Sequence, residues 1–562
     1  MGIPSTNHDE SVDESTAAAI LRAAAVGGVA DLWMTTGSDL TSFQEGVAQL
    51  RAAGQPVPRI VTAAHEHVGL TAAMGQTMVT GRPAMTAVHA DLGVLHHGGA
   101  LHNALVGRYP ILMVSGYPPV TPERRGHQVY WYQQRFDQGA TVRQYVKWDY
   151  KLSPLEDPTV VTARALQVAT SPPVGPVYLA VPDEVARAPA QRDVARTWNA
   201  PPMELGAGPM DAVEEIAARL ATARRPVLLL ERSGRDPRTV EVTARLAERH
   251  GLPVVARRYR LNIPDGHAWL VPERALTQAD VVVGLESPVP WVPARGGPPT
   301  DAWYASVGTD PLAEDVPLWE FPVDRAIQAD PYRFLVALEA ALDAQASTRD
   351  RRDDRRAWVD EQVGSLSRPS TSGWGPVAVA RVLDEGLDRD DLLVSEVFDT
   401  SSIRRSQPGT LFEKGASSLG WAQAAAIGAR YGADDRPTVA VTGDGSFLFG
   451  APTAAFLLQQ SLDAPVVTVI LNNGGYRTGT TTLRAHYPDG AAIAARDLSG
   501  GLLEPALDHA AQAVAAGGYG ATATDADELR SALVAARREV EERRVPAIVD
   551  VRVPTHREVV LG

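Results

Sequence analysis

The sequence contains no cysteine. This absence excludes disulfide bonds, thiolate nucleophiles and cysteine-based zinc sites. A long apolar run is missing too, because no stretch of about eighteen uncharged apolar residues occurs. The first fifteen residues also lack the basic and then apolar segments of a secretory signal. We therefore expect a cytoplasmic protein that does not bind membranes.

Positive charge is in deficit. The chain carries 53 Lys and Arg residues against 67 Asp and Glu residues, which gives a formal net charge of −14. Non-specific attraction to nucleic acid or to an anionic membrane is therefore disfavoured, and any anionic ligand must be bound by local interactions.

A dinucleotide fingerprint is also missing. The chain shows no G-x-G-x-x-G with a downstream acidic residue, which is the motif expected of a nicotinamide or flavin oxidoreductase. That class remains an alternative only because nucleotides can bind to α/β domains in general. Binding of FAD has no support in the sequence.

The composition is that of a globular enzyme with several domains. The chain has 562 residues, of which 44% are hydrophobic and 21% are charged. Short apolar runs alternate with helical patterns, which predicts an α/β protein with three doubly wound domains and mainly parallel sheets. We place a disordered N-terminus at residues 1–15 and the three domains at 16–190, 191–365 and 366–562.

Two segments are predicted to connect these domains. Residues 184–203 are polar, rich in alanine and contain proline, which is typical of a linker. The run from 345 to 375 is first highly charged and then rich in Ser, Pro and Gly, which predicts a solvated helix followed by a second linker.

A carboxylate stands inside a glycine turn near residue 444. The stretch "GDGSFLFG" follows a short apolar run and places Asp444 between Gly443 and Gly445, while Asn472 and Asn473 end the next predicted strand. Ligands of open parallel sheets bind outside the carboxyl ends of the strands, where these residues would meet. Carboxylate, amide and backbone oxygens suit Mg²⁺. The alternative is an ordinary strand-turn-helix loop with its polar side chains in solvent.

The two motifs "GDGSFLFG" and "LNNGGY" resemble the diphosphate motif of thiamine diphosphate enzymes, in the branch of acetolactate synthases, benzoylformate decarboxylases and 2-hydroxyacyl-CoA lyases. The resemblance spans nearly the whole chain and implies pyrimidine-binding, middle and diphosphate-binding domains, in that order. It implies thiamine diphosphate and Mg²⁺ as cofactors, with Asp444, Asn473 and the carbonyl of Gly475 as metal ligands. The residues implied in cofactor binding by the same motifs are Gly443, Asp444, Gly445, Ser446, Asn473, Gly475 and Tyr476.

The same resemblance requires a glutamate at the start of a helix after the second strand. "VTAAHEHVGL" supplies it as Glu66. The resemblance implies that this carboxyl group hydrogen-bonds N1′ of the aminopyrimidine and promotes the tautomer that takes the proton from C2 of the thiazolium. Glu66 must then carry or share a proton near neutral pH, which burial would favour. The alternative is a solvated helix glutamate.

A third element is "GASSLGWAQAAAIGA". It is similar to a family motif in which a bulky residue folds the cofactor into a V shape, and Leu419 occupies that position. Ser417 stands where the family has glycine, and its carbonyl is implied as the acceptor for the 4′-amino group. Upstream, the hydroxyl groups of Thr400, Ser401 or Ser402 are candidates for binding the diphosphate. In isolation, the pattern also fits an alanine-rich core helix.

His89 distinguishes the chain from the synthases. It follows the run "AMTAV" and falls where benzoylformate decarboxylases carry a histidine used in proton transfer. A histidine can move protons at neutral pH, which a threonine cannot. Most of the nearby histidines are expected in the core or on the surface, and their spacing predicts no zinc site; they are His65, His67, His96, His97 and His102.

Substrate specificity is expected in loops. Candidates are His127, Tyr132 and Gln134 in one loop, Tyr476 and Arg477 after the asparagine pair, and a possible lid at 478–490. A further cluster, Arg257, Arg258 and Arg260, would bind a nucleotide or CoA phosphate, although such clusters are more often simply solvated.

These residues predict an enzyme that makes or breaks a carbon–carbon bond next to a carbonyl group. The first reading is decarboxylation or carboligation of a 2-keto acid, as in acetolactate synthases, and the second is cleavage of a 2-hydroxyacyl-CoA. A non-catalytic cofactor-binding subunit is disfavoured because Glu66, Asp444 and Asn473 occur together. The resemblance implies a homodimer as the minimum and allows a homotetramer, since two chains would contribute to each site.

Overall fold

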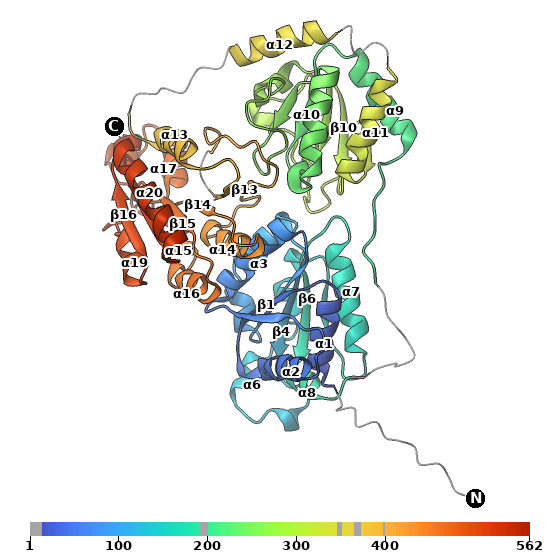
Figure 1. Cartoon of the computed structure of the whole chain (residues 1–562), viewed down its shortest axis with the longest axis vertical. Coiled ribbons are helices and arrows are strands. Elements are labelled where there is room, and N and C mark those ends of the chain that lie inside the picture. The colour runs from blue at the N-terminus through green and yellow to red at the C-terminus, as the bar shows by residue number, and fades with distance from the viewer. Residues whose placement is uncertain (1–13, 192–199, 346–350, 365–372, 397–399, 562) are drawn as a thin grey trace, which may run out of the picture. The chain divides into compact units, whose positions relative to one another are not determined.

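The computed structural model describes residues 14–191, 200–345, 351–364, 373–396 and 400–561. The chain divides into two compact units, Met1–Pro202 and Met203–Gly562. All strand pairs of the named sheets are parallel and helices accompany each sheet (Figure 1), so the predicted α/β class is confirmed. Most of the predicted disordered segment lies outside the described residues. Ser15, the last residue of that predicted segment, is described: its side chain accepts a hydrogen bond from the backbone N–H of Ala18 and caps the first helix.

The first unit holds one sheet with the strand order β2-β1-β3-β4-β6-β5. Every residue of β3, β4 and β6 is buried, as expected for parallel strands covered on both faces. The strands are β1 (Asp31–Thr35), β2 (Arg59–Thr62), β3 (Ala84–Val88), β4 (Ile111–Tyr117), β5 (Asp149–Lys151) and β6 (Val177–Pro182). The helices are α1 (Thr16–Val26), α2 (Thr41–Ala52), α3 (Glu66–Thr80), α4 (Leu92–His96), α5 (Ala100–Val106), α6 (Val129–Gln133), α7 (Pro158–Thr170) and α8 (Asp183–Arg187).

Successive side chains of β1 point to opposite faces of the sheet and pack into two different layers. Leu32 and Met34 join the core formed with α1, α2, α7 and α8. Trp33 points to the opposite face, where its indole N–H donates to Gln76 of α3 over 3.0 Å. Because side chains alternate along a strand, α3 covers the second face of the sheet.

The second unit holds two sheets. The first has the order β11-β10-β9-β7-β8 and the second has the order β13-β12-β14-β15-β17-β16. The strands of the first are β7 (Pro226–Leu230), β8 (Val254–Ala256), β9 (Val281–Leu285), β10 (Trp303–Gly308) and β11 (Arg325–Gln328). Those of the second are β12 (Leu392–Ser395), β13 (Leu411–Glu413), β14 (Thr438–Gly443), β15 (Val467–Asn472), β16 (Tyr519–Ala523) and β17 (Ala547–Arg552).

Helices surround both sheets of this unit (Figure 1). The first sheet is accompanied by α9 (Met210–Thr222), α10 (Arg238–His250), α11 (Pro331–Asp343) and α12 (Arg352–Gly364). Those of the second are α13 (Pro376–Gly386), α14 (Ala422–Gly432), α15 (Asp444–Phe449), α16 (Pro452–Leu462), α17 (Arg477–His486), α18 (Ala491–Ala494), α19 (His509–Ala515), α20 (Ala526–Glu542) and α21 (His556–Leu561).

Both predicted connecting segments contain packed helices. The first begins within α8, where Val185 and Ala186 are buried in the core of the first unit. The second contains α12, and the prediction of a solvated helix there is wrong for one face, because Trp358 and Val359 join the core around the first sheet of the second unit. The charged sequence concealed this face, since its apolar residues are few.

Arg355 shows why α12 is held in place. Its side chain is fully buried and donates to the carbonyls of Leu220 and Ala223 over 2.6 and 2.9 Å, and to that of His250 over 3.1 Å. These carbonyls lie at the C-terminal ends of α9 and α10, where a cation is favourable. Burial lowers the pKa of Arg355 to about 10, which still leaves it charged at neutral pH.

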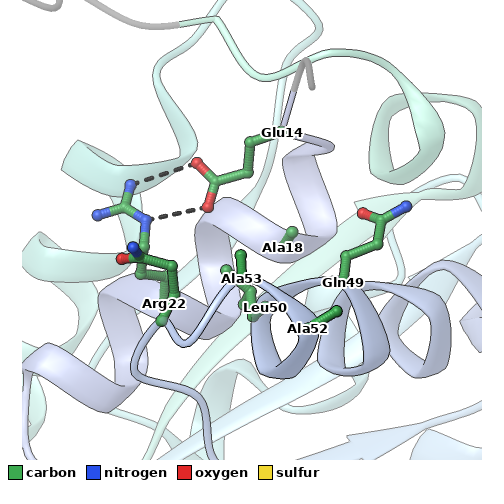
Figure 2. A pocket seen from close by; sticks show the side chains of 8 residues that line it. Glu14, Ala18, Arg22, Gln49, Leu50, Ala52 and Ala53 are labelled. Carbon is green, nitrogen blue, oxygen red and sulfur yellow. Dashed lines mark hydrogen bonds and ion pairs between the residues drawn. The ribbon is translucent and has the colours of Figure 1, made fainter. Parts of the chain in front are cut away.

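A surface cavity of about 640 Å³ lies between α1 and α2 of the first unit (Figure 2). Its lining includes Leu50 and the ion pair between Glu14 and Arg22. None of the predicted site residues lines it. In the described part of the chain, every helix is too short or too polar to cross a bilayer.

We predict that Arg355→Met destabilises the second unit by about 3 kcal/mol, because three buried carbonyls lose a charged donor. Differential scanning calorimetry should show a lowered transition temperature. The matched control is Arg381→Met on the exposed face of α13, which should change stability by about 0.5 kcal/mol or less. Equal transition temperatures for the two variants would contradict the capping role.

Candidate active site

Three neighbouring strands of the first unit each end at a titratable side chain. Strands β2, β1 and β3 lie side by side in parallel. Glu66 follows β2, Asp39 follows β1 and His89 follows β3. Because parallel strands direct their carboxyl ends to one edge, the three side chains gather at that edge.

Glu66 is the first residue of α3. The preceding His65 is the N-cap, and its Nδ1 accepts from the backbone N–H of His67 over 3.1 Å. The Glu66 residue is 8% exposed, and its Oε2 lies 3.3 Å from Nδ1 of His96. A side chain on Gly93 would come within 3.3 Å of Glu66 Oε1 and 3.4 Å of His89 Cβ. Gly93 therefore lies against both Glu66 and His89, and a side chain there would require its neighbours to shift.

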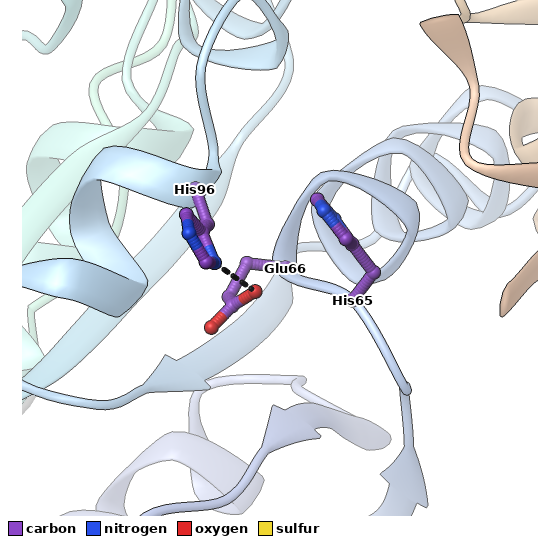
Figure 3. Close-up of side chains that lie close together, drawn as sticks. All are labelled: His65, Glu66 and His96. Atoms are coloured by element: carbon purple, nitrogen blue, oxygen red, sulfur yellow. Dashed lines mark hydrogen bonds and ion pairs between the residues drawn. The ribbon is translucent and has the colours of Figure 1, made fainter. Parts of the chain in front are cut away.

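Two further histidines surround the glutamate (Figure 3). The rings of His65 and His96 are stacked with centroids 5.6 Å apart, and the ligand atoms of His65, Glu66 and His96 lie within 4.8 Å of one another. These groups could hold a metal ion, which the sequence analysis did not expect from the histidine spacing. His65 and His96 belong to different segments, so no local motif reveals the cluster. His97 is a core histidine, and burial lowers its pKa to about 3.

His89 is held from both ring nitrogens. Its Nδ1 lies 2.5 Å from Oδ1 of Asp39, and its Nε2 lies 2.7 Å from the amide nitrogen of Gln133. Asp39 is fully buried, and its Oδ2 accepts from the backbone N–H of Ala90 over 2.9 Å. The partners assign Nδ1–H as donor to Asp39 and Nε2 as acceptor. The hydrogen bond to Asp39 raises the pKa of His89 against the opposing effect of burial.

Asp39 and Gln133 are the residues that sequence reasoning missed. Asp39 had a usable signal, since it follows the end of β1 much as Asp444 follows β14. Glycines make room for the pair: a side chain on Gly37 would lie 2.5 Å from Nδ1 of His89, and one on Gly116 would lie 1.7 Å from Oδ2 of Asp39. Substitution of either glycine would therefore displace the pair.

The loop between β4 and β5 places glutamines inward. Of the predicted substrate residues, Tyr132 is 65% exposed and accepts from Gln128, while His127 packs edge-on against Tyr130 at 6.1 Å. Gln134 is half-buried. Two glutamines of this loop are buried, Gln133 beside His89 and Gln138.

Gln138 anchors this loop to the sheet. Its Oε1 accepts from the N–H of Asp91 over 3.1 Å, and its amide N–H groups donate to Ser115 and Tyr178, each over 2.7 Å. A cavity of about 280 Å³ lies beside it, lined by side chains that include Tyr117, Phe136 and Lys151.

In the second unit, Asp444 meets the loop after β15. Its Oδ2 accepts from the N–H groups of Gly474 and Gly475 over 2.8 and 2.9 Å, and its Oδ1 accepts from that of Gly445 over 2.9 Å. Asp444 is buried, and burial raises its pKa while these N–H groups oppose the shift. The two strand ends that the sequence analysis paired do lie together, and Asp444 does not face solvent.

The donor set around Asp444 fits a hard divalent cation. The available groups are a buried carboxylate, the amide oxygen of Asn473 and the carbonyl of Gly475, and Mg²⁺ prefers such oxygen ligands. A bound cation would keep Asp444 ionised in spite of its burial. A cavity of about 240 Å³ adjoins the site and is lined in part by Asp444, Asn472 and Leu503.

Glycines allow the close packing of this loop. Gly475 has φ +149°, and a side chain there would lie 2.2 Å from the carbonyl oxygen of Gly501. A side chain on Gly445 would lie 2.6 Å from the ring of Tyr476. Gly443 and Ser446 flank Asp444 and Gly445, and Ser446 is buried in α15.

The loop before α14 packs against the end of α15. Gly420 has φ +87°, and a side chain there would lie 2.6 Å from the backbone of Gly450. Leu419 is half-buried, whereas Ser417 is exposed and its carbonyl accepts from Lys414 over 3.4 Å.

Glu396 fixes this loop to the sheet and was also missed. Its Oε2 accepts from the N–H of Trp421 over 2.8 Å, and its Oε1 accepts from the hydroxyl of Thr442 over 2.9 Å. Thr400, a predicted diphosphate residue, is buried and donates to Glu413, while Ser401 is exposed and Ser402 is half-buried.

The arginine cluster is neither solvated nor unpaired. Arg257 contacts Glu231 and Glu273 at 3.1 and 2.5 Å, and Arg258 contacts Asp265 at 2.5 Å. Arg260 is buried with its guanidinium 4.3 Å from the centre of the Tyr259 ring. The more common expectation of a solvated cluster is thus wrong, because acidic partners 7 to 26 residues away fold against the arginines.

Two protein-family models match the chain. The model described as thiamine pyrophosphate enzyme, N-terminal TPP binding domain, matches residues 14–141, and the C-terminal TPP binding domain model matches residues 397–551. A benzoylformate decarboxylase of Pseudomonas aeruginosa is 28% identical over 439 residues, which cover 74% of this chain and 79% of that protein. A 2-hydroxyacyl-CoA lyase of Oryza sativa subsp. japonica is 25% identical and covers 94% of each chain.

A solved structure shares the fold. The thiamine diphosphate-dependent 4-hydroxybenzoylformate decarboxylase of Rhodococcus jostii RHA1 aligns with a TM-score of 0.79 and 22% identity, over 96% of this chain and 99% of that one.

We predict that Asp39→Asn lowers the pKa of His89, because the charged acceptor of Nδ1–H is lost. The pKa can be measured from the pH dependence of deuterium exchange at the imidazole C2–H, followed by mass spectrometry of the peptide that contains His89. Asp137→Asn is the control, since Asp137 pairs with Arg143 at the surface. An unchanged His89 profile in Asp39→Asn would contradict the assignment.

The same shift has a stability consequence with a definite sign. A histidine whose pKa is raised by folding stabilises the folded state fully below its unfolded pKa of about 6.5. That contribution is lost as the pH rises through the raised value, so the stability advantage of the wild type over Asp39→Asn should shrink over that range.

Proposed function

The chain belongs to the thiamine diphosphate-dependent enzymes, and we propose that it decarboxylates a 2-keto acid, with or without carboligation of the product to a second carbonyl compound. Both cofactor-binding domain models match, and the relatives described above include a decarboxylase and a lyase. When bound, thiamine diphosphate supplies a carbon nucleophile for the keto carbonyl and an electron sink for the departure of CO₂.

We assign the diphosphate and its cation to the second unit. Asp444, Asn473 and the carbonyl of Gly475 would hold Mg²⁺, and the geometry supports this because Asp444 is buried against the 474–475 backbone. Leu419 would support the folded form of the cofactor, and the carbonyl of Ser417 would accept from its 4′-amino group, as the motif resemblance implies. Gly420 supports this placement, because it lets the loop before α14 approach the end of α15.

We assign proton transfer to the first unit. Glu66 would hydrogen-bond the aminopyrimidine, which its position at the start of α3 and its burial support. His89 would move a proton between its Nε2 and the reacting carbon or oxygen atoms of the substrate. Gln133 can hydrogen-bond to Nε2 whether or not that nitrogen carries a proton, because the side-chain amide offers both a donor and an acceptor.

The observation that carries the decarboxylase assignment is the chain of contacts Asp39–His89–Gln133. A decarboxylation ends with protonation of the carbon that lost CO₂, and this step requires a general acid that is protonated near neutral pH. Asp39 raises the pKa of His89 and so favours the charged acid. Asp39 is a positioning residue in this scheme, because it acts through His89.

Cleavage of a 2-hydroxyacyl-CoA is the second candidate, and the relative that covers 94% of both chains favours it. The arginine cluster does not add support, since Arg257 and Arg258 are paired with acidic residues of the same unit. Isothermal titration with CoA and with ADP separates the candidates: we expect no binding heat, whereas micromolar binding of CoA would favour the lyase.

We also propose a homodimer as the smallest active form, with a homotetramer as the larger alternative. The support is the motif resemblance, in which the glutamate and the metal site of two chains meet at one cofactor.

The activity is tested with a panel of aliphatic and aromatic 2-keto acids, thiamine diphosphate and Mg²⁺, with CO₂ and the products identified by mass spectrometry. We expect CO₂ release and an aldehyde or hydroxyketone product. Glu66→Gln should lower kcat by a factor on the order of 100 or more, while thiamine diphosphate binding measured by calorimetry stays within a few-fold. Unchanged turnover in this variant would contradict the proposed role of Glu66.

Glu45→Gln is the matched control for Glu66→Gln. Glu45 is exposed on α2, where it accepts from Gln49 over 3.2 Å, so its substitution should leave kcat and cofactor binding unchanged.

A further inference from the structure

The segment after β17 runs along the proposed metal loop. Two backbone hydrogen bonds join them, from the N–H of Val553 to the carbonyl of Asn472 over 3.1 Å and from the N–H of His556 to the carbonyl of Asn473 over 3.2 Å. They continue the parallel pairing of β15 with β17, in which Asn472 stands beside Arg552. The backbone therefore brings His556 next to Asn473.

The imidazole of His556 contacts the side-chain amide of Asn473. Its Nε2 lies 2.5 Å from Oδ1 of Asn473, and its Nδ1 lies 2.8 Å from the hydroxyl of Thr480. Residue 556 is 1% exposed. With Nε2–H donating to Asn473, Nδ1 is left as an acceptor for the Thr480 hydroxyl, whose single hydrogen is shared with the carbonyl of Arg477 at 3.0 Å.

The amide oxygen keeps capacity for a cation beside this contact. It accepts a second and longer hydrogen bond from the N–H of Gly475 over 3.2 Å. An amide oxygen has two lone pairs, so a cation can take the place of this weak contact while His556 keeps its own. Hydrogen-bond partners of a metal ligand fix its orientation and so contribute to metal affinity.

We propose that His556 is a positioning residue of the metal site, whose imidazole orients the Asn473 amide and joins it through Thr480 to the first turn of α17. This inference rests on the proposed function, because it takes Asn473 as a metal ligand. Helices α17 and α21 pack against each other, so the contact lies in an ordered interface rather than at a free end. Nothing in the "VPTHREVVLG" sequence marks such a role.

The test measures metal affinity rather than turnover. Full-length protein with saturating thiamine diphosphate is titrated with Mn²⁺, and free Mn²⁺ is followed by electron paramagnetic resonance. We expect His556→Ala to raise the dissociation constant for Mn²⁺ about tenfold or more. His556→Gln should restore most of the affinity, because its amide nitrogen can reach the place of Nε2. Thr480→Val should give an intermediate loss.

Arg557→Ala is the matched control. Arg557 is exposed on the same turn and pairs with Glu504 at 3.2 Å, so its substitution should leave the Mn²⁺ affinity unchanged. Thermal unfolding of the metal-free variants separates positioning from a structural role. A lowered unfolding temperature with wild-type Mn²⁺ affinity overturns the inference.

The outcomes also separate this inference from the proposed function. If His556→Ala and Thr480→Val bind Mn²⁺ as tightly as the wild type does, only the proposed role of His556 is contradicted. If wild type binds no Mn²⁺ in the presence of thiamine diphosphate, the proposed metal site falls together with it. Should His556→Ala fail to fold, His556→Gln and Thr480→Val decide the question by the same titration.

Discussion

The parallel direction of the strands is the constraint on which both candidate sites depend. In the first unit, β2, β1 and β3 run together and deliver Glu66, Asp39 and His89 to one edge. In the second, β14 and β15 do the same for Asp444 and the 473–475 loop. A strand of opposite direction at any of these positions would carry its last residues to the far edge. The order and direction of the strands thus bring the site residues together, and local contacts then fix their exact positions.

Buried carboxylates provide many of these local contacts. Asp39, Asp444 and Glu396 each lie close to a strand end, each is almost fully buried, and each accepts from at least one backbone N–H. A buried carboxylate is costly unless such donors compensate it. Once compensated, it fixes the loop that supplies the donors. The same groups therefore shape the backbone and hold His89 and the loop after β15 in place.

The sequence predicted the parts of the site that follow from strand order, and missed those that depend on distant contacts. The meeting of Asp444 with the loop after Asn473 could be predicted, because two neighbouring strands end there. Gln133 and His556 could not, since each reaches its partner across a separate segment of the chain. The burial of Arg355 was hidden for a related reason: its partners are helix carbonyls, which every residue possesses. The roles assigned to Glu66, His89 and the metal ligands stay predictions of the proposed function.

The glycine at position 116 has a consequence for redesign of the enzyme. It lies in β4, a strand that contributes none of the proposed reacting groups, yet any side chain there would overlap the carboxylate of Asp39. Libraries that aim to alter substrate preference should therefore hold this position constant along with Gly37. Diversity belongs instead at outward-facing positions of the loop after β4, such as Tyr132 and Phe136, where side chains are exposed and a change of shape displaces nothing in the core.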